Sequence, residues 1–165
     1  MKLIEATISD IPAIQAISDV AWPHTFRELL SPEQIAYMMD MMYSTQSLTR
    51  QMTEDNHHYL LAQDAEEYMG YLSYETNYKN SGLTKVHKIY IHPDAQGKGI
   101  GRFFIENASQ IAKEKNDKGL SLNVNKYNDR AIAFYRKMGF EIHHSEENDI
   151  GNGFIMDDYV MNLEF

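Results

Sequence analysis

The sequence has 165 residues, 43% of them hydrophobic and 24% charged, a balance typical of a folded globular protein and not of a disordered chain. This length predicts one domain over residues 1–165 with one hydrophobic core. The absence of cysteine excludes disulfides, thiolate zinc sites and a cysteine nucleophile. A net charge of -9 argues against nucleic acid and membrane partners. It would attract a cationic substrate, although such a charge more often serves only solubility. No stretch resembles a signal peptide, so we expect a cytoplasmic protein.

The amino-terminal part predicts a strand followed by helices. Lys2–Thr7 reads as a short strand, and Ser9 is expected to cap a helix with Pro12 in its first turn. The buried side of this helix is predicted to comprise Ile11, Ile14, Ile17 and Val20. Ser31 and Pro32 begin a second helix, in which Ile35, Met38, Met39 and Met42 recur at helical spacing. A further helical segment is expected over residues 46–53.

The remaining chain alternates between strands and helices. Residues 59–62 and 68–78 predict a β-hairpin. Strands are then expected at 85–92, 120–125, 140–145 and 154–165, with helices at 99–115 and 128–138. This order predicts a mixed sheet with helices on its faces.

A glycine-rich turn joins the strand that ends before Pro93 to the following helix. Gly97, Gly99 and Gly101 allow the backbone to approach a ligand closely, and the first N–H groups of a helix attract anions. Lys98 and Arg102 add positive charge in an acidic chain. The pattern favours an anionic ligand, although a plain glycine-rich connection is the alternative.

The turn matches neither a P-loop nor a dinucleotide fingerprint. Gln96 to Gly101 instead resembles the Q-x-x-G-x-G signature of the GNAT acetyltransferase superfamily. Residues 122–125, Asn128, Ala131 and 134–141 resemble the second half of that family's cofactor site. More weakly, residues 21–30 resemble the acceptor region of polyamine-type members, and 156–161 resemble a common closing strand.

The resemblance implies a mixed α/β GNAT fold: a mostly antiparallel sheet of about seven strands, about four helices, and two splayed parallel strands. It also implies that acetyl-CoA binds between those two strands, with its pyrophosphate on the glycine-rich turn. The cofactor-binding residues it assigns are Ile89, Tyr90, Ile91, Gln96, Gly97, Lys98, Gly99, Ile100, Gly101, Arg102, Asn128, Ala131 and Tyr135.

Three groups are expected to carry the chemistry. By similarity, the N–H of Ile89 stabilises the oxyanion and Tyr135 protonates the departing thiolate. Relatives often carry a glutamate as the base on the strand before the turn, and this chain has Lys85 and His87 there. His87 is the better candidate base because an imidazole is largely neutral near pH 7, with water as the alternative.

The predicted activity is transfer of an acetyl group from acetyl-CoA directly to a primary amine. A small cationic amine such as a polyamine is the favoured acceptor, with Trp22, His24 and Phe26 as candidate contacts. The alternatives are the amino-terminal or lysine amine of a protein, and a non-catalytic acyl-CoA-binding module. No metal is expected, because neighbouring histidines at 57–58 and 143–144 point to opposite faces of a strand unless it bends. A homodimer is retained as an alternative to a monomer.

Overall fold

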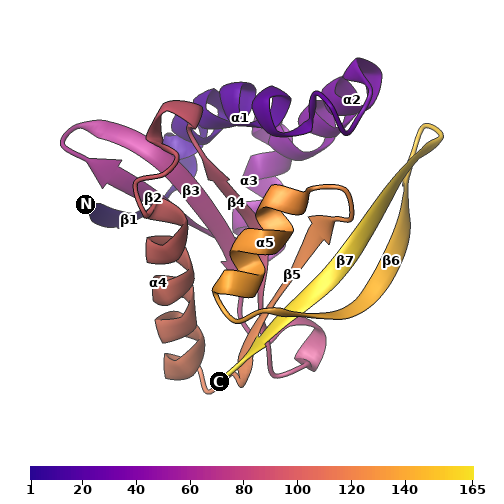
Figure 1. Cartoon of the computed structure of the whole chain (residues 1–165). Helices are drawn as coiled ribbons and strands as arrows, with labels where there is room; N and C mark the ends of the chain where they lie inside the picture. The colour runs from indigo at the N-terminus through magenta and orange to yellow at the C-terminus, as the bar shows by residue number, and fades with distance from the viewer. The chain divides into compact units, whose positions relative to one another are not determined.

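The computed structural model describes all 165 residues, and its elements follow the predicted order (Figure 1). The strands are β1 Lys2–Glu5, β2 His58–Asp64, β3 Glu67–Glu75, β4 Thr84–Ile91, β5 Gly119–Asn125, β6 Glu141–Gly151 and β7 Phe154–Glu164. The helices are α1 Ile11–Phe26, α2 Pro32–Tyr43, α3 Thr45–Thr53, α4 Ile100–Glu114 and α5 Asp129–Lys137. No helix combines the length and the apolar character needed to cross a bilayer.

The sheet confirms the predicted mixed, mostly antiparallel architecture. The hydrogen-bonded order of the seven strands is β1-β2-β3-β4-β5-β7-β6. β4 and β5 run parallel, while β1/β2, β2/β3, β5/β7 and β6/β7 are antiparallel pairs.

The chain forms two compact units, and each is described by itself. The first unit comprises residues 1–75 and 88–104, and the second comprises 76–87 and 105–165. β4 and α4 each begin in one unit and continue into the other.

The first unit is built around buried aromatic rings whose polar atoms bond to one another. The Trp22 indole N–H donates to the Tyr43 hydroxyl at 2.9 Å, and the Tyr71 hydroxyl donates to the same oxygen at 2.8 Å. Ser18 lies 2.8 Å from the Tyr71 hydroxyl and also donates to the Ile14 carbonyl. Buried polar groups need such partners, so this network lets tyrosines occupy the core.

Two details of the first helix differ from the sequence prediction. α1 begins at Ile11 and is not capped by Ser9, because a 3-10 turn over Ile8–Asp10 precedes it and the Thr7 N–H donates to the Asp10 carboxylate at 2.8 Å. Val20, expected inside, is 43% exposed. Ser18 takes a buried place instead, because its hydroxyl is satisfied within the network.

The second unit has an apolar core beneath a long hairpin. Leu120, Leu122, Phe140 and Met161 are almost fully buried. β6 continues to Gly151, well past the predicted end at Ser145, because it pairs with β7 as far as Gly151↔Phe154 (Figure 1). The predicted caps of α5 are confirmed: Asn128 accepts the Ala131 N–H, and Gly139 follows the helix with φ 100°.

Candidate functional site

The glycine-rich turn presents its backbone to solvent just before α4. Gly97 and Gly99 have φ of 81° and 80°, the left-handed region that favours glycine, and a Cβ at either position would meet nothing within 4 Å. Gly97, Lys98 and Gly99 are exposed, whereas Ile100 is buried and anchors the start of the helix. The turn therefore offers an accessible helix amino terminus to an anion.

Contacts within the first unit hold this turn in place. The His92 ring nitrogen Nδ1 accepts the Asp94 backbone N–H at 3.2 Å. The His92 backbone N–H donates to the Met69 carbonyl on β3 at 2.8 Å. Ala95, at the end of the short 3-10 turn Pro93–Ala95, is 2% exposed. Lys98 and Arg102 are exposed on either side of the helix start.

The parallel pairing of β4 with β5 is short. Thr84–Val86 of β4 pairs with Leu120–Leu122 of β5 within the second unit.

The candidate leaving-group acid, Tyr135, lies on α5 in the second unit. Its side chain is 7% exposed and its ring contacts Phe140, with 5.6 Å between ring centroids. Burial raises the pKa of the Tyr135 hydroxyl above its usual value of 10.0, so the group stays protonated and can donate a proton or a hydrogen bond.

His87 and Lys85 are half-buried residues of β4 in the second unit. The His87 ring meets the edge of Tyr78, with centroids 5.4 Å apart. The Lys85 ammonium lies over the Tyr78 ring at 5.6 Å and donates a hydrogen bond to the Asn123 side-chain oxygen. Burial lowers the pKa of Lys85, and the nearby carboxylates of Glu146 and Asp158 counteract that effect.

The three candidate acceptor residues of α1 differ in accessibility. Trp22 and Phe26 are 2% and 5% exposed, and both contact the ring of Tyr90, with centroids 5.6 and 6.5 Å apart. His24 is exposed. Trp22 and Phe26 thus belong to the aromatic core and pack against the half-buried Tyr90.

A buried lysine in the first unit escaped the sequence reasoning. Lys88 is 8% exposed, and its ammonium lies 2.5 Å from the Gln51 side-chain oxygen and 2.6 Å from the Tyr59 hydroxyl. The rings of Tyr43 and Tyr59 lie 5.0 and 5.3 Å from it. Burial lowers the pKa of Lys88 to about 7. The sequence signal for this burial is that Lys88 lies on the same face of the strand as Val86 and Tyr90.

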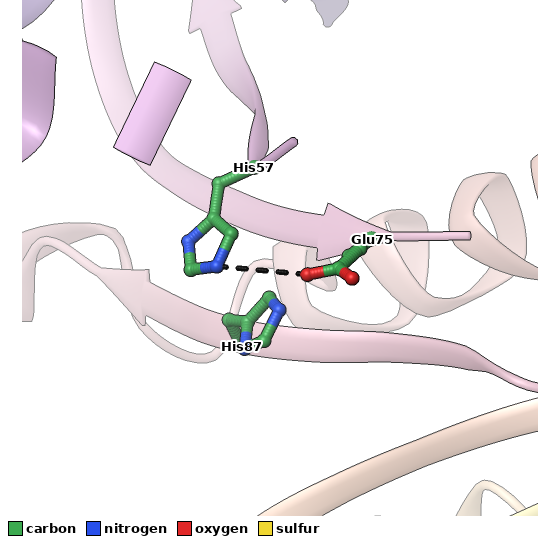
Figure 2. Close-up of side chains that lie close together, drawn as sticks. All are labelled: His57, Glu75 and His87. Atoms are coloured by element: carbon green, nitrogen blue, oxygen red, sulfur yellow. Dashed lines mark ion pairs between the residues drawn. The ribbon is translucent and has the colours of Figure 1, made fainter. Parts of the chain in front are cut away.

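His57 and Glu75 form a second polar feature of the first unit. Figure 2 shows the His57 ring turned toward the Glu75 carboxylate, with 3.7 Å between Nε2 and Oε1. Burial, followed by the positive charge of Lys88, lowers the pKa of His57 to about 4. The ring is therefore neutral at pH 7, and the contact is not an ion pair at that pH.

The histidine pair of β6 departs from the expected geometry. A register shift lies between Ile142 and His144, and the Nδ1 atoms of His143 and His144 are 2.7 Å apart. The bulge is the bend that the prediction named as its exception, and it breaks the alternation of side chains along the strand.

Comparison with known proteins identifies relatives. The acetyltransferase (GNAT) family matches residues 16–140. The spermidine N(1)-acetyltransferase of Thermoplasma acidophilum is 23% identical over 161 residues, which cover 95% of this chain and 96% of that protein. The peptidyl-lysine N-acetyltransferase YjaB of Salmonella typhimurium is 42% identical over 64 residues. That alignment covers 38% of this chain and only 41% of YjaB.

Solved structures show the same fold. The PaiA N-acetyltransferase of Thermoplasma acidophilum, a complex with coenzyme A, superposes with a TM-score of 0.82 at 21% identity and covers 99% of this chain and 98% of its own. The ribosomal-protein-S18-alanine N-acetyltransferase of Escherichia coli has a TM-score of 0.73 at 18% identity and covers 99% and 92%.

Proposed function

Because this chain belongs to the acetyltransferase (GNAT) family, we propose that it transfers the acetyl group of acetyl-CoA to the primary amine of a small cationic molecule. The family match over residues 16–140 carries the proposal. We further propose that residues 1–165 act as one acetyltransferase domain.

The residues present fit a coenzyme A tail. Exposed backbone at Gly97 and Gly99 precedes a helix, and the cations of Lys98 and Arg102 flank it, which suits a pyrophosphate. Gln96 precedes these glycines, and Ile100 and Gly101 begin α4. The backbone of Ile89, Tyr90 and Ile91 would bind the pantetheine amides. Asn128 precedes α5 and caps it with its side-chain oxygen, so its NH₂ can donate to the cofactor. Ala131 and Tyr135 continue the same helix. Acetyl-CoA supplies the acetyl thioester.

The chain's own groups move the protons of the reaction. His87, or a water molecule, takes a proton from the acceptor ammonium so that its nitrogen lone pair can attack the acetyl carbonyl. The Ile89 N–H donates to the carbonyl oxygen as negative charge develops on it. Tyr135 gives a proton to the sulfur as the carbon–sulfur bond breaks. No covalent enzyme intermediate is needed, because both substrates react within one site.

The acidic composition and the full-length similarity to a spermidine acetyltransferase support a polyamine acceptor. The shorter but closer match to a peptidyl-lysine acetyltransferase favours a lysine side chain as the second candidate. Trp22, Phe26 and His24 would shape the acceptor side of the site, the first two through Tyr90.

Thiol release from acetyl-CoA tests the proposal. Purified protein is incubated with acetyl-CoA and a panel of polyamines, monoamines, amino acids and lysine-containing peptides. We expect release with polyamines above the rate of acetyl-CoA hydrolysis. Release with peptides alone would replace the polyamine by a protein acceptor. Coenzyme A binding without release for any amine would identify a non-catalytic binding module.

A further inference from the structure

A polar cluster lies on the sheet of the second unit, formed by one side chain from each of four strands. Its members are Lys85 of β4, Asn123 of β5, Glu146 of β6 and Asp158 of β7. We call it the four-strand cluster. The Asn123 side chain is its centre: its oxygen accepts from Lys85, and its NH₂ lies 3.2 Å from Glu146 Oε2 and 3.4 Å from Asp158 Oδ2.

Two carboxylates face each other in this cluster. Glu146 and Asp158 are direct cross-strand partners in the β6/β7 register, and like charges in that arrangement repel. Glu146 is held in its ionised form, because hydrogen bonds from His144, Asn148 and Asn123 lower its pKa to about 2. Its oxygens are thus already engaged by neighbouring side chains.

Asp158 is the unsatisfied member. It is 7% exposed, and its Oδ1 is buried with no hydrogen-bond partner. Burial, and to a lesser extent the charge of Glu146, raise the pKa of Asp158. A buried carboxylate oxygen without a donor is costly to the fold, and such groups need an explanation.

The charges of the cluster leave room for one more cation. Glu146 and Asp158 contribute two negative charges when ionised, and Lys85 contributes one positive charge. His144, 3.0 Å from Glu146, adds positive charge only when its ring is protonated. The Lys85 ammonium already lies in the field of both carboxylates, which shows the kind of group that this place attracts.

We propose that the four-strand cluster binds a second ammonium group of the acceptor, with Asp158 Oδ1 as its principal hydrogen-bond acceptor, so that the substrate is a diamine or polyamine. This deepens the proposed function and rests on it. Asp158 pairs with Asn125 at the carboxyl end of β5, and three residues later Asn128 begins the helix that carries Tyr135. Asn123 is exposed and Glu146 is half-buried, so these two members of the cluster are reachable from solvent, whereas Asp158 Oδ1 is buried and meets a ligand only if neighbouring side chains move.

Replacement of Asp158 by Asn removes the charge and keeps the shape. A hydrogen bond to a charged group contributes roughly 1.5 to 3 kcal/mol, so kcat/KM for spermidine should fall about 10- to 150-fold. The KM for acetyl-CoA and the rate with a monoamine such as butylamine should be unchanged. Glu146→Gln, at a more exposed position, should also lower kcat/KM for spermidine. It replaces Asp158→Asn as the test variant if Asp158→Asn does not fold.

The hairpin supplies a matched control. Glu147 and Asp157 are the neighbouring cross-strand pair, and successive side chains point to opposite faces of the sheet. Glu147→Gln removes the same charge from an exposed position on the same strand and should leave the spermidine-to-butylamine ratio unchanged. If Glu147→Gln and Glu146→Gln lower the spermidine-to-butylamine ratio equally, the effect comes from the overall charge of the protein, and the proposal is overturned.

Lys85→Met gives a test with the opposite sign. Without the Lys85 ammonium, the Glu146 and Asp158 carboxylates can bind only the ammonium group of the substrate, so the KM for spermidine should fall several-fold. A KM that is unchanged or higher would show that Lys85 does not compete with substrate, which contradicts the charge argument.

A binding measurement separates failure of the cluster from failure of the proposed function. Calorimetry with spermidine and coenzyme A-saturated protein should show binding that Asp158→Asn weakens. If no amine releases thiol but this difference is observed, the cluster stands and the catalytic proposal falls. If wild-type protein acetylates amines and Asp158→Asn keeps its preference for spermidine over butylamine, the cluster proposal is overturned alone.

Discussion

The buried Tyr135 hydroxyl is the group that the proposed reaction uses to protonate the leaving sulfur. Tyr135→Phe keeps the ring against Phe140 and removes only the proton donor. General acid catalysis contributes roughly 100- to 10,000-fold, and we expect kcat to fall by about 100-fold. Coenzyme A affinity, measured by calorimetry, should change little.

Tyr127→Phe is the control for that change, because Tyr127 is 64% exposed just before the same helix. It should have wild-type turnover. A Tyr135→Phe protein that turns over as fast as wild type would remove the assigned role and leave Tyr135 as a packing residue.

Lys88 makes a prediction about pH and stability. Its pKa is lowered to about 7 in the folded protein by burial, against 10.5 in an exposed lysine. Between these pH values the unfolded chain binds more protons than the folded protein, so the free energy of unfolding increases as pH rises from about 7 to 10.5. Below pH 7 the destabilisation caused by burying the charged Lys88 is present in full. Lys88→Met should flatten this slope, because it removes the group that titrates. Tyr59 and Gln51 keep a partner in this variant, since they bond to each other at 2.6 Å.

Urea unfolding at about pH 6, 8 and 10 measures the slope directly. The exposed Lys118→Met serves as the control and should follow the wild-type curve. If Lys88→Met and wild type show parallel pH profiles, Lys88 keeps an ordinary pKa in the fold.

At the scale of elements, the turn before α4 depends on backbone conformation. Gly99 has φ of 80°, and an L side chain there costs roughly 1 to 2 kcal/mol. In Gly99→Ala the backbone can relieve this strain by moving to a negative φ. Cofactor binding must then return the backbone to the left-handed conformation, at the same cost in free energy. We expect the Kd for coenzyme A to rise about 5- to 30-fold, as measured by calorimetry.

Gly82 offers a comparison with the same backbone requirement elsewhere. Its φ is 74° and a Cβ there also meets nothing within 4 Å, but it lies in the turn before β4. Gly82→Ala should carry a similar strain and leave coenzyme A affinity intact. Equal affinities for Gly99→Ala and wild-type protein would contradict the assignment of this turn to the cofactor.

Over the whole molecule, features that depend on near neighbours along the chain were predictable. The left-handed glycines at 97 and 99 and the Asn128 cap follow from residues within a few positions, so the sequence alone determined the turn, the start of α5 and the order of strands and helices. The same local reasoning missed the 3-10 turn before α1 and the bulge at His144.

Only the tertiary structure decided which polar side chains are buried and which charges meet. Lys88 is buried because α3 and β2 supply Gln51 and Tyr59 from far along the chain. Asp158 faces Glu146 because of the β6/β7 register, and Lys85 joins them through Asn123 on β5. Burial and charge environment are set by strands that are distant in sequence and adjacent in the sheet, and no local pattern encodes that adjacency.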